Sequence, residues 1–110
     1  MNKRDAAQAF EHLIKKPNCP KCILACTTHS LEGCVIAASR LKLSIPGEYN
    51  LAGFSVEDPR YIFPLPLTAI VQKPTELGMQ AGELMLKRLR NPAKSLAPKI
   101  QLINTELISG

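Results

Sequence analysis

The stretch PLPLTAIVQKPTELGMQAGELMLKRLRN, Pro64–Asn91, decides the fold of this chain. Its first part, residues 67–72, is a short aliphatic and β-branched run bounded by prolines, which is typical of a buried or half-buried strand. Pro74 suits the first turn of a helix, because the N–H that proline lacks would have no partner there. Apolar residues then recur at helical spacing until Pro92. The stretch therefore predicts a strand that leads directly into an amphipathic helix beginning near Thr75.

The remaining segments predict further helices and strands in alternation. The expected elements are a helix over Arg4–Lys16, a buried parallel strand over Cys22–Cys26, a helix over Ser30–Leu43 with Thr28 as its N-cap, a strand over Leu51–Val56, and a last strand near a sheet edge over Lys99–Ser109. The resulting order α-β-α-β-β-α-β indicates an α/β fold with a mainly parallel sheet. The helix from Ser30 is apolar beyond a single stripe, so we expect a second packing partner for it.

The composition is that of one small globular domain. The chain has 110 residues, of which 45% are hydrophobic, and its net charge is +5. Many of its cations stand at the ends of two predicted helices, where they suit the helix dipole, so the charge alone does not predict direct nucleic-acid binding. The sequence has no apolar run near the roughly 20 residues that a membrane span needs, and it does not start like a signal peptide. We therefore expect a cytoplasmic protein that does not contact a membrane.

The cluster Cys19-x-x-Cys22-x-x-x-Cys26-x-x-His29 could hold zinc or act in thiol redox chemistry. Its context opposes both roles. Cys22 opens a predicted strand and not a helix, and in a strand Cys22 and Cys26 lie about 13 Å apart, too far to share a metal ion. A zinc or redox module stays an alternative that rests on the cysteines alone, and we expect no metal.

The sequence shows no arrangement typical of catalysis. His12 and His29 have no patterned nucleophile or carboxylate partner, and no glycine-rich phosphate loop is present. Gly78 and Gly82 lie four residues apart on the predicted third helix, where either a ligand or a strand could approach closely, and we favour the strand. We therefore expect a protein that is not an enzyme and uses no cofactor.

Three stretches resemble the LacI/GalR family of bacterial transcription regulators, namely ILACTTHSLEG (Ile23–Gly33), LSIPGEYNLAGFSVED (Leu43–Asp58) and PLPLTAIVQKPTELGMQAGELMLKRL (Pro64–Leu89). In that family the matching segments contain Ala-Asn-Asp, Gly-Phe-Asp-Asp, and Pro-Pro-Leu-Thr-Thr before a glutamine and a helix. The resemblance implies an incomplete three-layer α/β/α fold of the type I periplasmic-binding-protein kind. It assigns residues 4–56 and 98–109 to the C-terminal lobe and residues 67–91 to the N-terminal lobe, and it leaves the DNA-binding headpiece outside this chain.

The resemblance also implies a ligand site at Thr27, Thr28, Ser55 and Gln72. The family uses Asn-Asp at the first two positions and Asp at the third to bind sugar hydroxyls or nucleobase atoms, whereas Gln72 keeps the family's residue type. Threonine and serine can donate and accept hydrogen bonds but carry no charge. These replacements therefore imply an effector that is different, less polar or more weakly bound, or the loss of effector binding. The alternative is that these hydroxyls only cap strand ends.

The resemblance to the LacI/GalR family also implies a homodimer. The family dimerises partly through the helix after the first strand and through the segment after Gly-Phe-Asp-Asp, which here gives Glu32, Val35, Ile36, Ser39, Tyr61, Ile62 and Phe63. The last three form an apolar triplet between prolines, as expected of a surface loop. In the alternative, Val35 and Phe63 fold inward and the chain is a monomer.

These features together predict a fragment of a LacI/GalR-type regulator. Its intact form is expected to bind a small, sugar-like effector and to dimerise, and it would contact DNA only through the missing headpiece. The alternative is a fragment of a periplasmic sugar-binding transport protein with the same fold.

Overall fold

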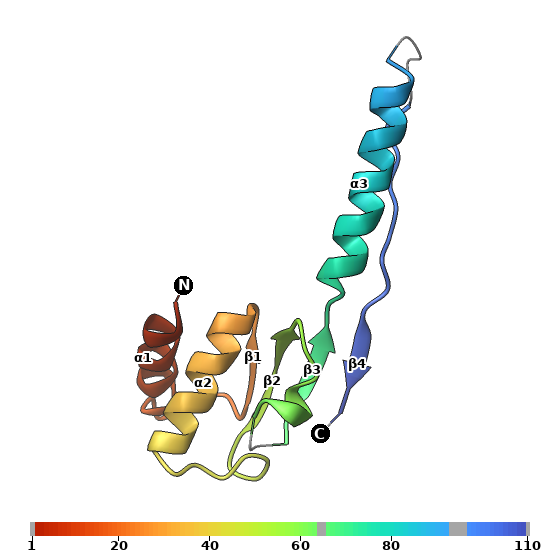
Figure 1. Ribbon diagram of the computed structural model, residues 1–110. Helices are drawn as coiled ribbons and strands as arrows, with labels where there is room; N and C mark the ends of the chain where they lie inside the picture. The colour runs from red at the N-terminus through yellow and green to blue at the C-terminus, as the bar shows by residue number, and fades with distance from the viewer. Residues whose placement is uncertain (1, 64–65, 93–96, 110) are drawn as a thin grey trace. The chain divides into compact units, whose positions relative to one another are not determined.

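The computed structural model describes residues 2–63, 66–92 and 97–109. Its elements are α1 (Lys3–Ile14), β1 (Cys22–Ala25), α2 (Thr28–Arg40), β2 (Asn50–Ser55), the short 3-10 helix η1 (Pro59–Tyr61), β3 (Thr68–Val71), α3 (Pro74–Arg90) and β4 (Glu106–Ile108) (Figure 1). The predicted order of helices and strands is confirmed. The chain forms two compact units, one with the residues up to Gln72 and those from Glu106, the other with Lys73–Thr105.

The first unit contains a single sheet with the strand order β1-β2-β3-β4. β1, β2 and β3 are parallel, with Ile23 opposite Leu51 and Gly53 opposite Ala69. β4 is antiparallel to β3 at the edge of the sheet. The mainly parallel sheet and the last strand at its edge are thus confirmed. The last strand is shorter than predicted, since within Lys99–Ser109 only Glu106–Ile108 pairs with a neighbour.

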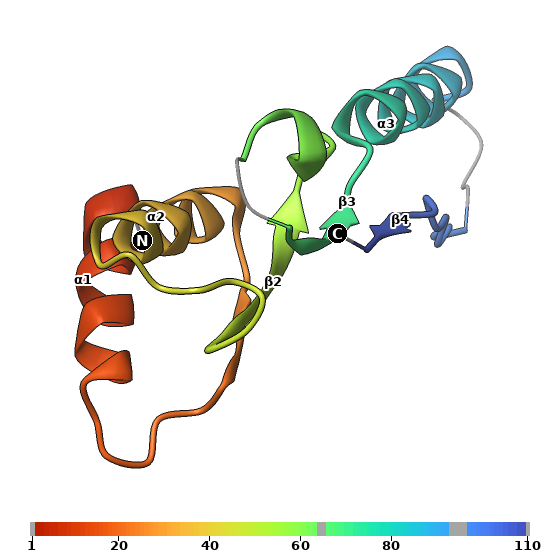
Figure 2. The ribbon, with the colours of Figure 1, turned by 90° about the horizontal axis from the view of Figure 1, so that it is seen from below.

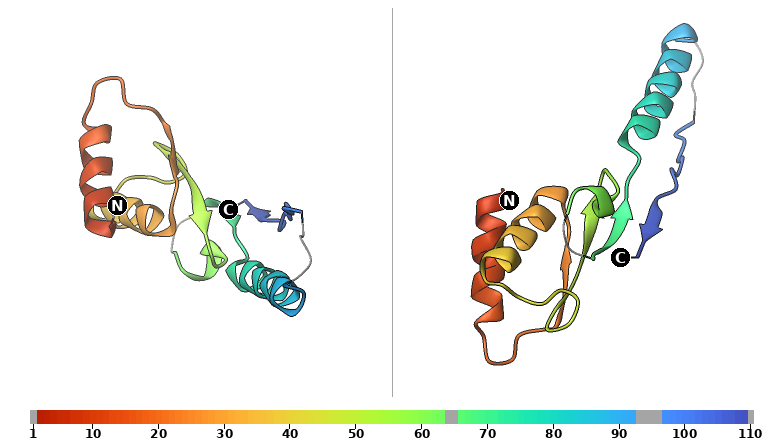
Figure 3. Two further views of the ribbon diagram at one scale, coloured as in Figure 1. Left: turned by 90° about the horizontal axis from the view of Figure 1, so that it is seen from above. Right: turned by 60° about the horizontal axis from the view of Figure 1, so that its bottom comes forward.

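Helix α2 lies between α1 and the strands β1 and β2, and both helices are on the same side of these strands (Figure 2). Two further views show the same layering (Figure 3). The expected second packing partner of this helix is therefore α1. Leu31 and Phe10 are buried in the core between these elements, and each such burial contributes about 1.5–3 kcal/mol.

A glycine makes the close crossing of α1 and α2 possible. A Cβ atom added at Gly33 would lie 2.4 Å from the Lys3 carbonyl oxygen and 2.7 Å from the Ala6 Cβ. Only a residue without a side chain leaves room for the α1 backbone at this point. The crossing brings the first turn of α1 beside the middle of α2.

The starts of both helices follow from capping chemistry. Asn2 is the N-cap of α1, and its side chain accepts the Asp5 N–H at 2.8 Å. The N-cap of α2 is Thr27, not Thr28 as predicted. The Thr27 hydroxyl accepts the Ser30 N–H at 3.1 Å, so the helix starts at Thr28.

Strand β1 is less buried than predicted. Its burial alternates toward the end of the strand, with Ala25 buried and Leu24 57% exposed. Successive side chains of a strand point to opposite faces of the sheet. In the first unit, as far as the structure describes it, α2 covers only one of these faces. β1 therefore has an alternating pattern and is not buried on both faces.

The second unit contains α3, which begins at Pro74 as predicted. The Arg88 side chain donates to the Ala97 carbonyl at 3.2 Å, and the side chains of Gln80 and Gln101 are hydrogen bonded. None of the described residues of α3 is buried. A methyl group added at Gly78 or Gly82 would meet no described atom within 4 Å, so the predicted close packing of a strand against these glycines is wrong for the part described.

The boundary between the two compact units falls at Lys73. The reason is that β3 pairs with β2, which holds residues 68–71 in the first unit. The assignment of the two units to lobes of a larger core stays a prediction. No helix within the described residues is both long and apolar enough to cross a membrane.

Candidate functional site

The carboxyl ends of β1, β2 and β3 lie side by side at one end of the sheet, because these strands are parallel. We call this end the carboxyl edge, which is distinct from the lateral edge formed by β4. Ser55 ends β2 opposite Val71, and its carbonyl accepts the Gln72 N–H at 2.8 Å. Thr27 comes two residues after Ala25, which ends β1 opposite Gly53. The structure thus brings the four predicted ligand residues to the same edge. In open parallel sheets this edge is the usual place for a ligand.

The Thr27 hydroxyl takes part in a local hydrogen-bond pair with Ser30. It accepts the Ser30 N–H, as described above, and donates to the Ser30 Oγ at 2.8 Å. Thr27 therefore caps the start of helix α2 and not the end of a strand, and its ligand role stays a prediction. Thr27 is nevertheless exposed and Thr28 half-buried, so both can still reach a ligand at the surface.

Ser55 does not present its hydroxyl at this edge. The residue is 0% exposed, its Oγ donates to the Glu57 carbonyl at 2.7 Å, and it accepts the Glu57 N–H at 3.3 Å. A serine side chain is short enough to turn back onto the backbone two residues later. The prediction that Ser55 binds a ligand is therefore wrong in this structure, and its role is to shape the turn after β2.

Gln72 is exposed directly after β3. Its amide can both donate and accept hydrogen bonds. Together with Thr27 and Thr28 it gives this edge three neutral polar side chains. Such groups suit hydroxyl-rich or amide-bearing ligands but provide no charge-assisted bond.

The loop after β2 contains an ion pair that the sequence did not predict. The Asp58 carboxylate accepts from the Arg60 Nη2 at 2.6 Å and from the Arg60 Nε at 3.0 Å. These bonds to Arg60 lower the pKa of the Asp58 carboxyl group. The signal in the sequence is the spacing of Asp58 and Arg60, an acidic and a basic residue two positions apart. Because the carboxylate is already paired, it does not replace the Asp that the family has at Ser55.

The predicted interface residues fall into two groups. Val35 is buried among the core residues, so its assignment to an interface is wrong. Phe63 is half-buried and packs against the core, and its assignment to an interface stays a prediction. The other five lie at the surface or half-buried. They are Glu32, Ile36, Ser39, Tyr61 and Ile62, of which Ile36 is 45%, Tyr61 88% and Ile62 43% exposed.

The cysteines are free thiols. Cys19 Sγ lies 3.5 Å from the Tyr49 hydroxyl, and Cys34 is buried, which raises the pKa of its thiol. The residues that the structure describes contain no group of three or more metal-ligating side chains. His12 is exposed, as predicted.

Comparison with known proteins identifies the family. The family model of the periplasmic binding protein-like domain matches residues 1–110 of this chain. The ribose operon repressor of Haemophilus influenzae is 31% identical over 84 residues, which are 76% of this chain and 25% of the repressor. The repressor PurR of Glaesserella parasuis is 24% identical over 106 residues, which cover 92% of this chain and 31% of PurR.

A solved structure agrees with these sequence matches. A LacI family transcriptional regulator from Enterococcus faecalis V583, crystallised with bound ribose, superposes with a TM-score of 0.83 at 26% identity, covering 99% of this chain and 39% of that one. The chain thus spans only about a quarter to two fifths of the length of these relatives. The resemblance in the sequence is confirmed, and the chain belongs to the family of periplasmic binding protein-like domains.

Proposed function

We propose that this chain is part of the effector-binding core of a LacI-type transcription regulator that acts in the cytoplasm. In the intact protein, this core binds a small sugar-like effector, dimerises, and thereby controls DNA binding by a separate headpiece. The observation that carries the proposal is the meeting of Thr27, Thr28 and Gln72 at the carboxyl edge of a parallel sheet. The names of the relatives, which are repressors, support a regulator over the alternative of a transport protein and over an enzyme.

The effector contacts are neutral hydrogen bonds in this proposal. Thr27 and Thr28 offer hydroxyls, and Gln72 offers an amide, all at exposed or half-buried positions. Ser55 contributes only the shape of its turn, since both its hydroxyl hydrogen bonds are used internally. Without a carboxylate, this edge binds a sugar more weakly than a charged site does.

Nuclear magnetic resonance titration tests the ligand proposal. Adding ribose to the 110-residue chain should shift the amide signals of Thr27, Thr28 and Gln72, with a dissociation constant no tighter than about 1 mM. The variant Gln72→Ala should reduce these shifts, whereas Gln101→Ala, a matched change at another exposed glutamine, should not. A micromolar sugar complex, or shifts that avoid this edge, would contradict the proposal.

We infer further that the dimer uses the exposed group of predicted interface residues. Tyr61 and Ile62 are neighbouring apolar residues in and after η1, and Ile36 is the exposed aliphatic residue of α2. Fully burying a large apolar side chain contributes about 1.5–3 kcal/mol, so a few such residues can support association. Val35 does not take part, because it is already buried within the core of the chain.

Light scattering tests this assembly. The wild type should be a dimer at high micromolar concentration, and Tyr61→Asp with Ile62→Asp should be a folded monomer. Met79→Asp serves as the matched control, because Met79 is an exposed apolar residue of α3. A monomeric wild type, or dissociation caused by the Met79 change instead, would show that this surface is not the interface.

A further inference from the structure

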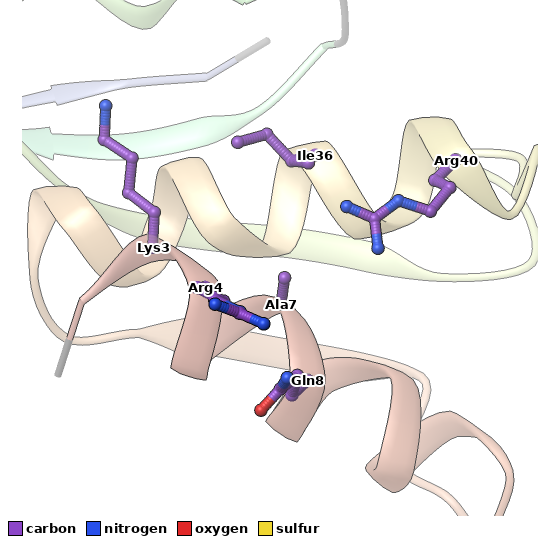
Figure 4. Close-up of a pocket in the computed structure, with 6 residues that line it drawn as sticks. All are labelled: Lys3, Arg4, Ala7, Gln8, Ile36 and Arg40. Atoms are coloured by element: carbon purple, nitrogen blue, oxygen red, sulfur yellow. The ribbon is translucent and has the colours of Figure 1, made fainter.

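A hollow lies between α1 and α2 in the first unit, away from the strand ends described above. Its volume is about 420 Å³, and six residues line it (Figure 4), namely Lys3, Arg4, Ala7, Gln8, Ile36 and Arg40. A volume of this size is within the range of small-molecule sites, about 300–1,000 Å³. The residues come from two helices that the Gly33 crossing holds together.

The lining of this hollow is basic. It contains three cations and no acidic residue. The Arg4 side chain extends from α1 and the Arg40 side chain from α2, on either side of the Ala7 methyl group (Figure 4). The ion pairs found among the described residues engage Lys3 with Glu32 at 2.8 Å and Arg40 with Glu11 at 3.3 Å, and none engages Arg4.

The pair with Glu11 leaves Arg40 able to bind a ligand. A guanidinium group has five N–H donors, and Glu11 accepts from only one nitrogen, Nη1. The pair also restrains the orientation of the guanidinium, which reduces the entropy that a ligand must overcome. The remaining N–H donors of Arg40 and those of Arg4 belong to side chains that line the same hollow.

The lining of the hollow also has an apolar part. It contains the methyl group of Ala7 and the side chain of Ile36, next to the neutral polar Gln8. An anion with a short carbon skeleton matches both the basic part and the apolar part of the lining. A phosphomonoester presents three terminal oxygens in a tetrahedral arrangement and carries more negative charge than a carboxylate. It therefore suits two guanidinium groups that approach from different helices better than the two coplanar oxygens of a carboxylate do.

We propose that this hollow binds a phosphomonoester, with the phosphate between Arg4 and Arg40 and the carbon skeleton against Ala7 and Ile36. A nucleic acid is a worse match, because the next cations along α1, Lys15 and Lys16, lie at the opposite end of the helix and form no continuous basic track with the hollow. The proposal does not depend on the sugar site, whose residues are at the strand ends.

Titrations with inorganic phosphate and with glycerol 3-phosphate at constant ionic strength test the site. Both ligands should shift the amide signals of residues 3–8 and 36–40 in a saturable way, and glycerol 3-phosphate should bind more tightly. Arg4→Gln and Arg40→Gln should each weaken binding at least about tenfold, the loss expected for a charged hydrogen-bond pair. Arg4→Lys, which keeps the charge but removes the fork, should lie in between.

Two controls separate this site from general charge effects and from assembly. Lys16→Gln removes the same charge from an exposed position of the chain outside the hollow and should leave phosphate binding unchanged. Because Ile36 also belongs to the proposed dimer surface, the titrations are repeated with the Tyr61→Asp and Ile62→Asp variant, which should bind phosphate at least as tightly as the wild type; loss of binding in this variant overturns the proposal. The proposal is overturned if no saturable shift occurs, if Lys16→Gln weakens binding as much as Arg4→Gln, or if glycerol 3-phosphate binds no more tightly than phosphate.

Discussion

The substitution Gly33→Ala tests the crossing on which the first unit depends. The added Cβ would lie 2.4 Å from the Lys3 carbonyl oxygen and 2.7 Å from the Ala6 Cβ. Because non-bonded carbon atoms pack at about 3.5–4.0 Å, α1 would have to move away by about 1 Å. The nearest atom belongs to the backbone, so no side-chain rotation can relieve the contact.

Two opposing effects set the size of the change. Overpacking of this kind costs about 1–3 kcal/mol, and the upper part of that range applies where a backbone must move. Replacing glycine by alanine within a helix favours folding by about 0.5–1 kcal/mol. We therefore expect Gly33→Ala to lower the free energy of unfolding by about 1–2 kcal/mol. In urea this is a decrease of the unfolding midpoint by roughly 0.5–1 M.

Urea unfolding followed by circular dichroism measures the effect. Gly82→Ala is the matched control, because it adds the same methyl group to a helix where nothing described lies within 4 Å. It should leave α3 at least as helical as in the wild type. If Gly33→Ala is as stable as the wild type or more stable, the close crossing of α1 and α2 is refuted.

Three further changes probe local features. Thr27→Ala should lower the free energy of unfolding by about 1 kcal/mol because α2 loses its N-cap, whereas Thr28→Ala should have a smaller effect in the same urea experiment. The buried thiol of Cys34 should react with a disulfide reagent far more slowly than the exposed thiol of Cys22, because burial raises its pKa and hinders access; equal rates by absorbance would contradict this. Asp58 has a lowered pKa in the folded chain, so its pair with Arg60 stabilises the chain above the ordinary carboxyl pKa, and this stability is lost as the pH falls through the folded-state pKa. The urea midpoint of the wild type should therefore fall toward that of Asp58→Asn on acidification, and a constant difference between the two would count against the pair.

Much of the fold could be predicted because its signals are local. The short aliphatic run predicts strand β3, and Pro74 with the apolar spacing after it predicts the start of helix α3. Each signal lies within a few residues. The mainly parallel sheet follows from the alternation of helices and strands along the chain. The strand-end positions of Thr27, Thr28 and Gln72 follow equally, since the carboxyl ends of parallel strands meet at one edge.

Other features were decided only by the tertiary structure. The periodicity of α2 shows that the helix is apolar on more than one side, but not that α1 covers the second side and draws Val35 into the core. The sequence likewise indicates a polar Ser55 at a strand end, whereas the turn directs its hydroxyl to Glu57. The hollow between Arg4 and Arg40 depends on the close approach of the α1 backbone at Lys3 to Gly33 of α2, two residues that are far apart in the chain.

The physical reason for this division is the range of the interactions. Capping, turn chemistry and apolar spacing act between residues a few positions apart, so the sequence by itself determined the elements, their order and the edge where the strands end. Which partner covers a helix, and which polar group is satisfied internally, depends on contacts between residues far apart in the chain, such as the one at Gly33. Only packing in three dimensions decides those contacts.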